Sequence, residues 1–135
     1  PVLTLNNPSD QIKRGQYLVE GPGHCGECHT PRNLLGGPKF GQWLAGAVNP
    51  EGEGVIQNIT TGEGGIADWS ESQLASMLKD GFTPEFDSVG GSMTAVVANW
   101  SHVSDEDRAA VAAYLKAVPA HANGYPVLTK PAANQ

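Results

Sequence analysis

The sequence predicts an all-α fold in which three main helices are joined by long loops. In three stretches, a serine that can cap a helix stands before apolar residues spaced three and four positions apart. The composition indicates the loops, since the 135 residues include 17 Gly and 10 Pro. Together these observations favour one helical domain over residues 9–119, with tails at 1–8 and 120–135.

The first helix is expected directly after Ser9, and the run Gly21-Pro22-Gly23 ends it. Its inward face carries Ile12, Gly15, Leu18 and Val19. Gly15 is expected where this helix crosses the last one, at Tyr114, because a small residue lets an aromatic ring approach closely.

The second helix is predicted between Ser70 and Gly81, because Gln73 stands three residues after the serine, as in a capping box. Its apolar stripe consists of Leu74, Met77 and Leu78. The third helix is predicted between Ser104 and Pro119, and its first turn holds the acidic residues 105–107, which suit the positive end of a helix. Its stripe consists of Val111, Tyr114, Leu115 and Val118.

A stretch rich in Gly, Pro and Asn separates the first two helices. At about forty residues it is longer than the loops of most compact domains, unless such a loop serves a function. A short β-hairpin is expected within it, around residues 44–47 and 54–58. Wrapping a bound group would account for the rest of its length.

The bound group is indicated by residues 25–29, which read Cys-Gly-Glu-Cys-His and hold the only two cysteines of the chain. This C-x-x-C-H pattern is the attachment site of a c-type haem, with two thiols for thioether bonds and an imidazole for the iron. A thioredoxin-like redox pair would need a βαβ context, which is not visible. A zinc site would need a second cluster of ligands, but His24, His102 and His121 are scattered.

Composition and charge limit the function further. Only 39% of the residues are apolar, so a buried porphyrin would supply part of the core. The formal net charge of −6 argues against nucleic acid or an anionic membrane as partner. It favours redox proteins with a basic docking patch, although the charge could also serve solubility alone.

No apolar stretch is long enough to span a membrane, and no signal segment is recognised within these 135 residues. We nevertheless expect the periplasm, because c-type haem is attached outside the bacterial cytoplasm.

The order helix, C-x-x-C-H, loops, helix, methionine loop, helix resembles the class I cytochromes c. More narrowly, the sequence resembles the cytochrome c subunits of bacterial membrane dehydrogenases for alcohols, aldehydes and gluconate. The segments that carry this resemblance are His24 to Asn33, Asn58-Ile59-Thr60, Gly65 to Ser70, Ser104 to Asp107 and Ala113-Tyr114-Leu115. Those subunits often carry three haem domains, so this chain resembles a single-domain relative or one domain of a longer protein.

The axial ligands follow partly from the motif and partly from the resemblance. His29 is the fifth ligand, and the resemblance places the acceptor for its second ring nitrogen in a proline-containing loop, at Pro38. For the sixth ligand we choose Met93, which lies in a Gly-Gly-Ser-Met turn where the family has its methionine, although Thr94 replaces the usual proline after it. His102 is the alternative, whereas Met77 fits the apolar stripe of a helix.

Three further residues are expected near the haem propionates. The resemblance gives this role to Arg32, and Trp69 and Asn58 are expected to border the same groups. Arg32 could equally be an exposed loop residue, and Trp69 could belong to the core.

The predicted function is one-electron transfer by a carrier that is not itself an enzyme, because His/Met ligation closes the iron to small ligands and small-molecule substrates. The alternatives are a haem enzyme or a gas or redox sensor with a displaceable sixth ligand, and an electron-entry domain of a larger oxidoreductase.

Overall fold

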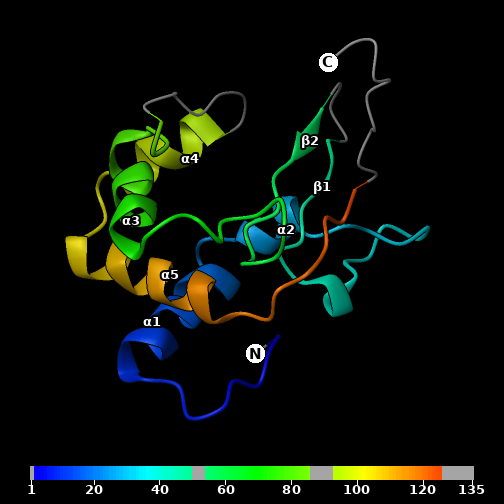
Figure 1. The fold of residues 1–135 in the computed structure, drawn as a ribbon, viewed down its shortest axis with the longest axis horizontal. Helices are drawn as coiled ribbons and strands as arrows, with labels where there is room; N and C mark the ends of the chain where they lie inside the picture. The colour runs from blue at the N-terminus through cyan, green and yellow to red at the C-terminus, as the bar shows by residue number, and fades with distance from the viewer. Residues whose placement is uncertain (1, 50–53, 86–92, 126–135) are drawn as a thin grey trace.

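A computed structural model describes residues 2–49, 54–85 and 93–125. Its elements, in chain order, are α1 (Asp10–Glu20), α2 (Cys25–His29), a 3₁₀ turn η1 (Phe40–Gln42), β1 (Ala47–Val48), β2 (Val55–Ile56), α3 (Glu71–Asp80), α4 (Met93–Trp100) and α5 (Asp105–Ala117) (Figure 1). The strands β1 and β2 pair antiparallel, with Ala47 opposite Ile56. The all-α fold with a short hairpin is therefore confirmed.

The three helices expected from the sequence begin where their capping serines stand. The side chain of Ser9 accepts a hydrogen bond from the backbone N–H of Ile12, and that of Ser104 accepts one from Asp107. Ser70 and Gln73 form a complete capping box at the start of α3. These bonds satisfy N–H groups that a helix leaves free at its first turn.

The helices α1 and α5 cross at Gly15, as expected. A Cβ atom on Gly15 would overlap the backbone of Ala110 and lie 2.7 Å from the Cβ of Tyr114, so only glycine fits. Arg14 pairs with Asp107 across the same contact, at 2.9 Å from Nε to the carboxylate. The close approach makes α1 and α5 the frame on which the other elements pack.

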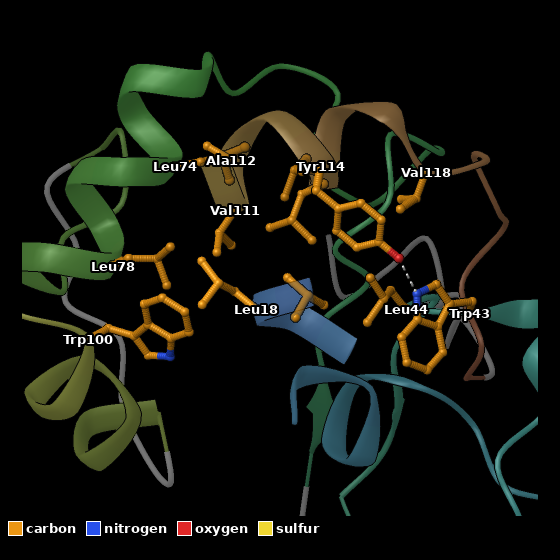
Figure 2. Packing of buried hydrophobic residues seen from close by; sticks show 13 residues of the cluster. Leu18, Trp43, Leu44, Leu74, Leu78, Trp100, Val111, Ala112, Tyr114 and Val118 are labelled. Atoms are coloured by element: carbon orange, nitrogen blue, oxygen red, sulfur yellow. Dashed lines mark hydrogen bonds between the residues drawn. The ribbon is translucent and has the colours of Figure 1, made fainter. Parts of the chain in front are cut away.

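The core lies between this frame, α3 and the loop that precedes β1 (Figure 2). Its largest fully buried side chain is Tyr114. The Tyr114 hydroxyl accepts a hydrogen bond from Nε1 of Trp43 at 3.0 Å and donates one to the Glu20 carboxylate at 2.8 Å. Since Trp43 belongs to the loop, this chain of bonds joins the loop to both helices of the frame.

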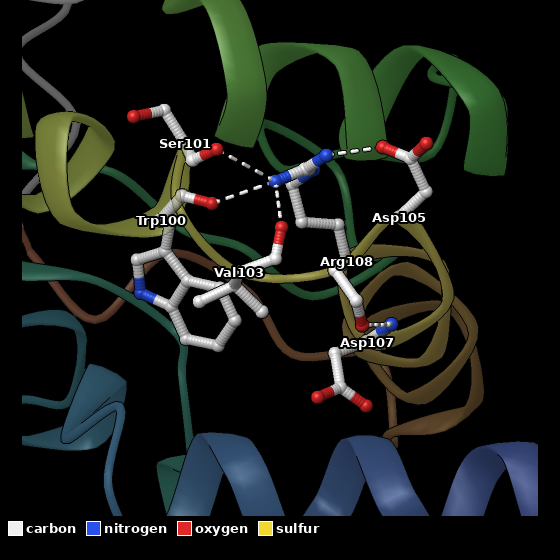
Figure 3. Close-up of polar contacts among 7 residues, drawn as sticks. Trp100, Ser101, Val103, Asp105, Asp107 and Arg108 are labelled. Carbon is white, nitrogen blue, oxygen red and sulfur yellow. Dashed lines mark hydrogen bonds and ion pairs between the residues drawn. The ribbon is translucent and has the colours of Figure 1, made fainter.

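The sequence did not predict α4, which packs beside α3 and is joined to α5 by Arg108 (Figure 3). The Arg108 guanidinium is buried, with the residue only 4% exposed. It donates to the carbonyls of Trp100 at 2.8 Å and Ser101 at 3.3 Å, to that of Val103, and to the Asp105 carboxylate. The carbonyl of Trp100 and those of the turn after α4 thus receive a donor from the first turns of α5.

Parts of the expected tails pack against the domain. The backbone N–H of Val2 donates to the Glu20 carboxylate at 2.8 Å, and that of Gly124 donates to the carbonyl of Ala45 at 2.8 Å. Within the described ranges, no helix is long and apolar enough to cross a membrane.

Candidate metal centre

The helix α2 presents both cysteine sulfur atoms of the chain on a single turn. Cys25 and Cys28 are free thiols, the first half-buried and the second exposed. Residues three positions apart share one face of a helix. Burial raises the pKa of the Cys25 thiol to about 11. Two thioether bonds to one porphyrin are therefore compatible with this helix.

The start of α2 lies where α1 ends and where Trp100 of α4 approaches. A Cβ on Gly23 would lie 3.1 Å from the Trp100 indole and 3.5 Å from Sγ of Cys25. A cavity of about 270 Å³ opens beside this point. Its lining is mostly apolar and comprises Leu18, Pro22, Gly23, Val96, Asn99, Trp100 and Val103. A larger hollow of about 730 Å³ borders α1 and Phe40, but its lining includes neither cysteine nor His29, so its position does not suit haem attachment.

His29 is buried, at 8% exposure, and its ring is held by one short hydrogen bond. Nδ1 lies 2.7 Å from the carbonyl oxygen of Gln57. A carbonyl only accepts, so Nδ1 carries the proton and Nε2 keeps the lone pair that binds a metal. Burial lowers the pKa of His29, against a smaller opposing effect of the Gln57 bond. The neutral imidazole that an iron ligand requires is therefore the stable form at neutral pH.

The expectation that a loop at Pro38 supplies the acceptor for His29 is wrong. Pro38 instead pairs with Arg32 in a β-bridge. Gln57 takes the acceptor role because the hairpin carries the chain back over α2, where the N–H of Gly46 also donates to the carbonyl of His29 at 2.6 Å. His29 is thus held through its ring and through its backbone.

The loop between α2 and β1 closes over α2 with an aromatic ring. A Cβ on Gly26, between the two cysteines, would overlap the indole of Trp43. The Thr30 hydroxyl accepts a hydrogen bond from the N–H of Leu44 at 3.0 Å. From the sequence, Trp43 could equally be a wall of the haem pocket or part of the core, and the structure places it against α2. The roles of Thr30 and Gln57 were not predicted, because each acts through a contact across the loop.

The candidates for the sixth ligand occupy different surroundings. Met93 is the first residue of α4 and is half-buried, and the residues before it, 86–92, lie outside the described ranges. Met77 packs against the core cluster. His102 is exposed in the turn after α4, and His24 is exposed with Nδ1 3.2 Å from the Glu27 carboxylate.

The three residues expected near the haem propionates differ in their burial and in their hydrogen-bond partners. Arg32 is exposed and donates to the carbonyls of Glu27 and Gly36 at 2.9 and 2.7 Å. Trp69 is half-buried against the core, and its carbonyl accepts a bond from Lys116 at 2.8 Å.

Asn58, by contrast, is buried and is the centre of a network. Its amide donates to the His121 carbonyl at 2.9 Å and to Asn123 at 3.0 Å, and its oxygen accepts from the backbone and hydroxyl of Thr60 at 2.9 and 2.8 Å. These bonds use both donors and both acceptor sites of the amide. Asn58 directly follows Gln57, so these bonds hold the segment after α5 next to the acceptor of His29.

The donor set, two thiols on one turn and a neutral, oriented imidazole, fits a covalently attached haem. Arg32 and Lys39 supply positive charge nearby in the sequence.

Comparison with known proteins agrees with this chemistry. The cytochrome c family model matches residues 12–119. The diheme cytochrome c-type protein of Cereibacter sphaeroides is 59% identical over 108 residues, which are 80% of this chain and 36% of that protein. The fructose dehydrogenase cytochrome subunit of Gluconobacter japonicus is 40% identical over 123 residues, which are 90% of this chain and 25% of the subunit. The gluconate 2-dehydrogenase cytochrome c subunit of Pantoea cypripedii is 34% identical over 126 residues, 88% of this chain and 29% of that subunit.

The chain thus spans about a quarter to a third of the length of these relatives. The family match covers most of the chain, and the helices with their small hairpin are those of the class I fold. The protein is therefore a member of the cytochrome c family, an electron-transfer domain that binds haem c covalently through its Cys-Gly-Glu-Cys-His motif at residues 25–29.

Proposed function

We propose that this domain carries single electrons between an oxidoreductase and a downstream haem or copper protein, with His29 and Met93 as axial ligands. The observation that carries the proposal is the 2.7 Å contact between Nδ1 of His29 and the Gln57 carbonyl. It fixes the tautomer and orientation of the imidazole, which a fifth ligand requires. Haem c supplies the one-electron chemistry when bound.

The side chains around the motif insulate and orient, and none of them needs to make or break a substrate bond. The Gln57 carbonyl holds the proton on Nδ1, and the indole of Trp43 covers Gly26 between the two cysteines. A thioether ligand from Met93 would favour ferrous iron and close the sixth position. The propionate contacts of Arg32, Trp69 and Asn58 stay predictions, and Asn58 already uses its whole amide within the protein.

The partners are proposed from the relatives and from charge. Two of the relatives are named as cytochrome subunits of fructose and gluconate dehydrogenases. We expect comparable redox proteins here, in the periplasm, and the net charge of −6 favours a partner with a basic patch.

An electron-entry domain of a larger oxidoreductase is the second candidate. It is favoured by the relatives' lengths, because the chain covers 36% of one and 25% of another.

The test is the absorption spectrum of the ferric holoprotein. A weak far-red band from sulfur bound to iron is expected in the native protein and in Met77→Leu, and it should disappear in Met93→Leu. A band that survives Met93→Leu but is lost in Met77→Leu would contradict the assignment. Absence of the band from the native protein, together with a change of spectrum in His102→Asn, would assign the site to His102.

Binding of carbon monoxide to the native ferrous protein at neutral pH separates carrier from enzyme or sensor. A closed site binds it poorly, so ready binding would contradict the electron-carrier proposal.

A further inference from the structure

Residues 32–39, called the leucine loop below, form a rigid turn directly after α2. The backbone of Arg32 and Pro38 pairs in a bridge, and the N–H of Asn33 donates to the carbonyl of Gly37 at 2.8 Å. The side-chain oxygen of Asn33 accepts from the N–H groups of Leu35 and Gly37, both at 3.0 Å. The turn is therefore held by its own hydrogen bonds and does not need outside contacts to keep its shape.

This turn holds two leucines in water. Leu34 is 106% and Leu35 97% exposed, more than any other large apolar residue in the described ranges. Phe40, at the base of the loop, is 54% exposed. Figure 1 shows the loop projecting from the body on the side away from α3 and α4. Single exposed leucines are common, whereas two adjacent ones on a projecting turn form a small exposed apolar patch that needs an explanation.

The charge of this region differs from that of the rest of the chain. Between residues 28 and 50 the charged residues are Arg32 and Lys39, although the chain has 14 acidic and 8 basic residues overall. The leucine loop is thus apolar at its tip and basic at its base. A complementary surface would be an apolar depression with an acidic rim.

The loop is also fastened to the haem-attachment helix. The Arg32 guanidinium donates to the carbonyl of Glu27, which lies between the two cysteines, at 2.9 Å. Electron transfer requires a partner to come close to the haem, so a partner that covers this loop would lie beside the attachment helix. A net charge of −6 opposes binding to an anionic membrane, where two basic residues add little attraction.

We propose that the leucine loop is the docking site for a protein redox partner whose surface is an apolar depression rimmed by carboxylates. This inference rests on the proposed carrier function and adds to it a second docking face, opposite in charge to the acidic surface that suits a basic partner. The contact would be small, as is usual for transient redox complexes.

The test uses the holoprotein on electrodes coated with defined monolayers. A mixed methyl- and carboxylate-ended monolayer imitates the proposed partner, and an amine-ended monolayer imitates a basic one. The variant Leu34→Ser/Leu35→Ser should transfer electrons at least about tenfold more slowly on the mixed monolayer, because it loses the apolar contact, and at the native rate on the amine-ended one. Tyr17→Ser, which removes a 58% exposed aromatic residue from α1, is the control and should keep the native rate on both.

A second pair of variants tests the positive charge at the base of the leucine loop. Lys39→Glu should slow transfer on the mixed monolayer, whereas Lys79→Glu, the same charge change on α3, should not. Equal rates for the native protein and the leucine variant on the mixed monolayer would overturn the proposal. So would leucine-dependent binding to vesicles that contain anionic phospholipid, because the loop would then be a membrane contact. A holoprotein without a reversible haem wave on either monolayer would contradict the carrier function itself.

Discussion

The surroundings of His29 and those of Met93 are built by different means. His29 is fixed by the Gln57 carbonyl through its ring and by Gly46 through its backbone, and both partners belong to the hairpin segment. Met93 is the first residue of α4, which has eight residues and is joined to α5 by the hydrogen bonds that Arg108 donates. The first arrangement spreads its support over several segments, whereas the second relies on packing against α3 and on the buried side chain of Arg108.

This difference predicts which of the two surroundings loses its structure first when denaturant is added. The His29 side shares its contacts with the frame of α1 and α5 through Trp43 and Tyr114, so it should persist until the domain unfolds. The Met93 side can separate earlier, once the bonds of Arg108 are broken. Under the proposed ligation, the far-red band would report the Met93 side and the denaturant midpoint would report the frame.

The largest effect is expected from Gly15→Ala, which attacks the frame that supports both sides. The added methyl would overlap the backbone of Ala110 and force α1 away from α5. A loss of about 3 kcal/mol or more in the free energy of unfolding is expected. Denaturant unfolding of the holoprotein measures it, with Gly41→Ala as control because a Cβ there meets nothing within 4 Å. A loss below that of the control variant would mean that the helices can separate at little cost.

Arg108→Met should come next and should separate the two sides. It removes the buried donor of the Ser101 and Val103 carbonyls, whereas the Trp100 carbonyl keeps the N–H of Val103 at 3.1 Å, and the expected cost is about 2–3 kcal/mol in the free energy of unfolding. The far-red band should be lost at a lower denaturant concentration than the overall fold, while in the native protein the two losses lie closer together. Arg108→Lys should restore part of the band's resistance, and Lys79→Met, which removes a charge from α3, should change neither. If the band and the overall fold of Arg108→Met were lost at the same denaturant concentration, α4 would unfold together with the rest of the domain.

A smaller effect on the His29 side is expected from Tyr114→Phe. The variant leaves Nε1 of the buried Trp43 without an acceptor, which costs about 1–2 kcal/mol in the free energy of unfolding. The far-red band of the folded protein should stay unchanged, because α4 is untouched. Tyr17→Phe, at an exposed position of α1, serves as the control for loss of a hydroxyl. Loss of the band in Tyr114→Phe at low denaturant would break the distinction between the two sides.

The smallest effect concerns the surface pair that joins α1 to α5. The Arg14 guanidinium holds the pKa of Asp107 below its usual value. The pair therefore stabilises the fold above the unfolded pKa, about 3.9, and its contribution is lost as the pH falls through the lower folded value. Asp107→Asn should lower the melting temperature slightly at pH 7, and the difference should shrink in acid. Glu106→Gln, a neighbouring change in the same first turn, is the control, and an equal shift in both variants would assign the effect to the helix end alone.

Sequence patterns predicted those parts of the fold that are encoded locally. Ser9, Ser70 and Ser104 each start a helix as expected, because the cap and the apolar stripe both lie within a few residues. The helix α4 was missed, because the sequence Gly-Gly-Ser-Met indicates a turn at Met93, and part of the support of α4 comes from the next helix, where Arg108 donates to the Trp100 carbonyl. Its stability is a property of the assembled fold.

The same limit applies to the site. The cysteine spacing was sufficient to predict covalent haem attachment, since both thiols and the imidazole belong to one short segment. The acceptor of His29 was not predictable, because a carbonyl carries no residue-type signal and Gln57 arrives through the hairpin. Asn58 was identified from its resemblance to a family segment, but its bonds to His121 and Asn123 depend on where the segment after α5 returns.

The indole that covers Gly26 also has a consequence for the maturation of the protein. In the folded chain Trp43 lies on Gly26, the neighbouring Cys25 is half-buried and burial raises the pKa of its thiol to about 11, so little of the reactive thiolate is present at neutral pH. Folding and haem attachment therefore compete for the same few residues. We therefore expect the cofactor to be joined to the chain before the loop that carries Trp43 closes over Gly26.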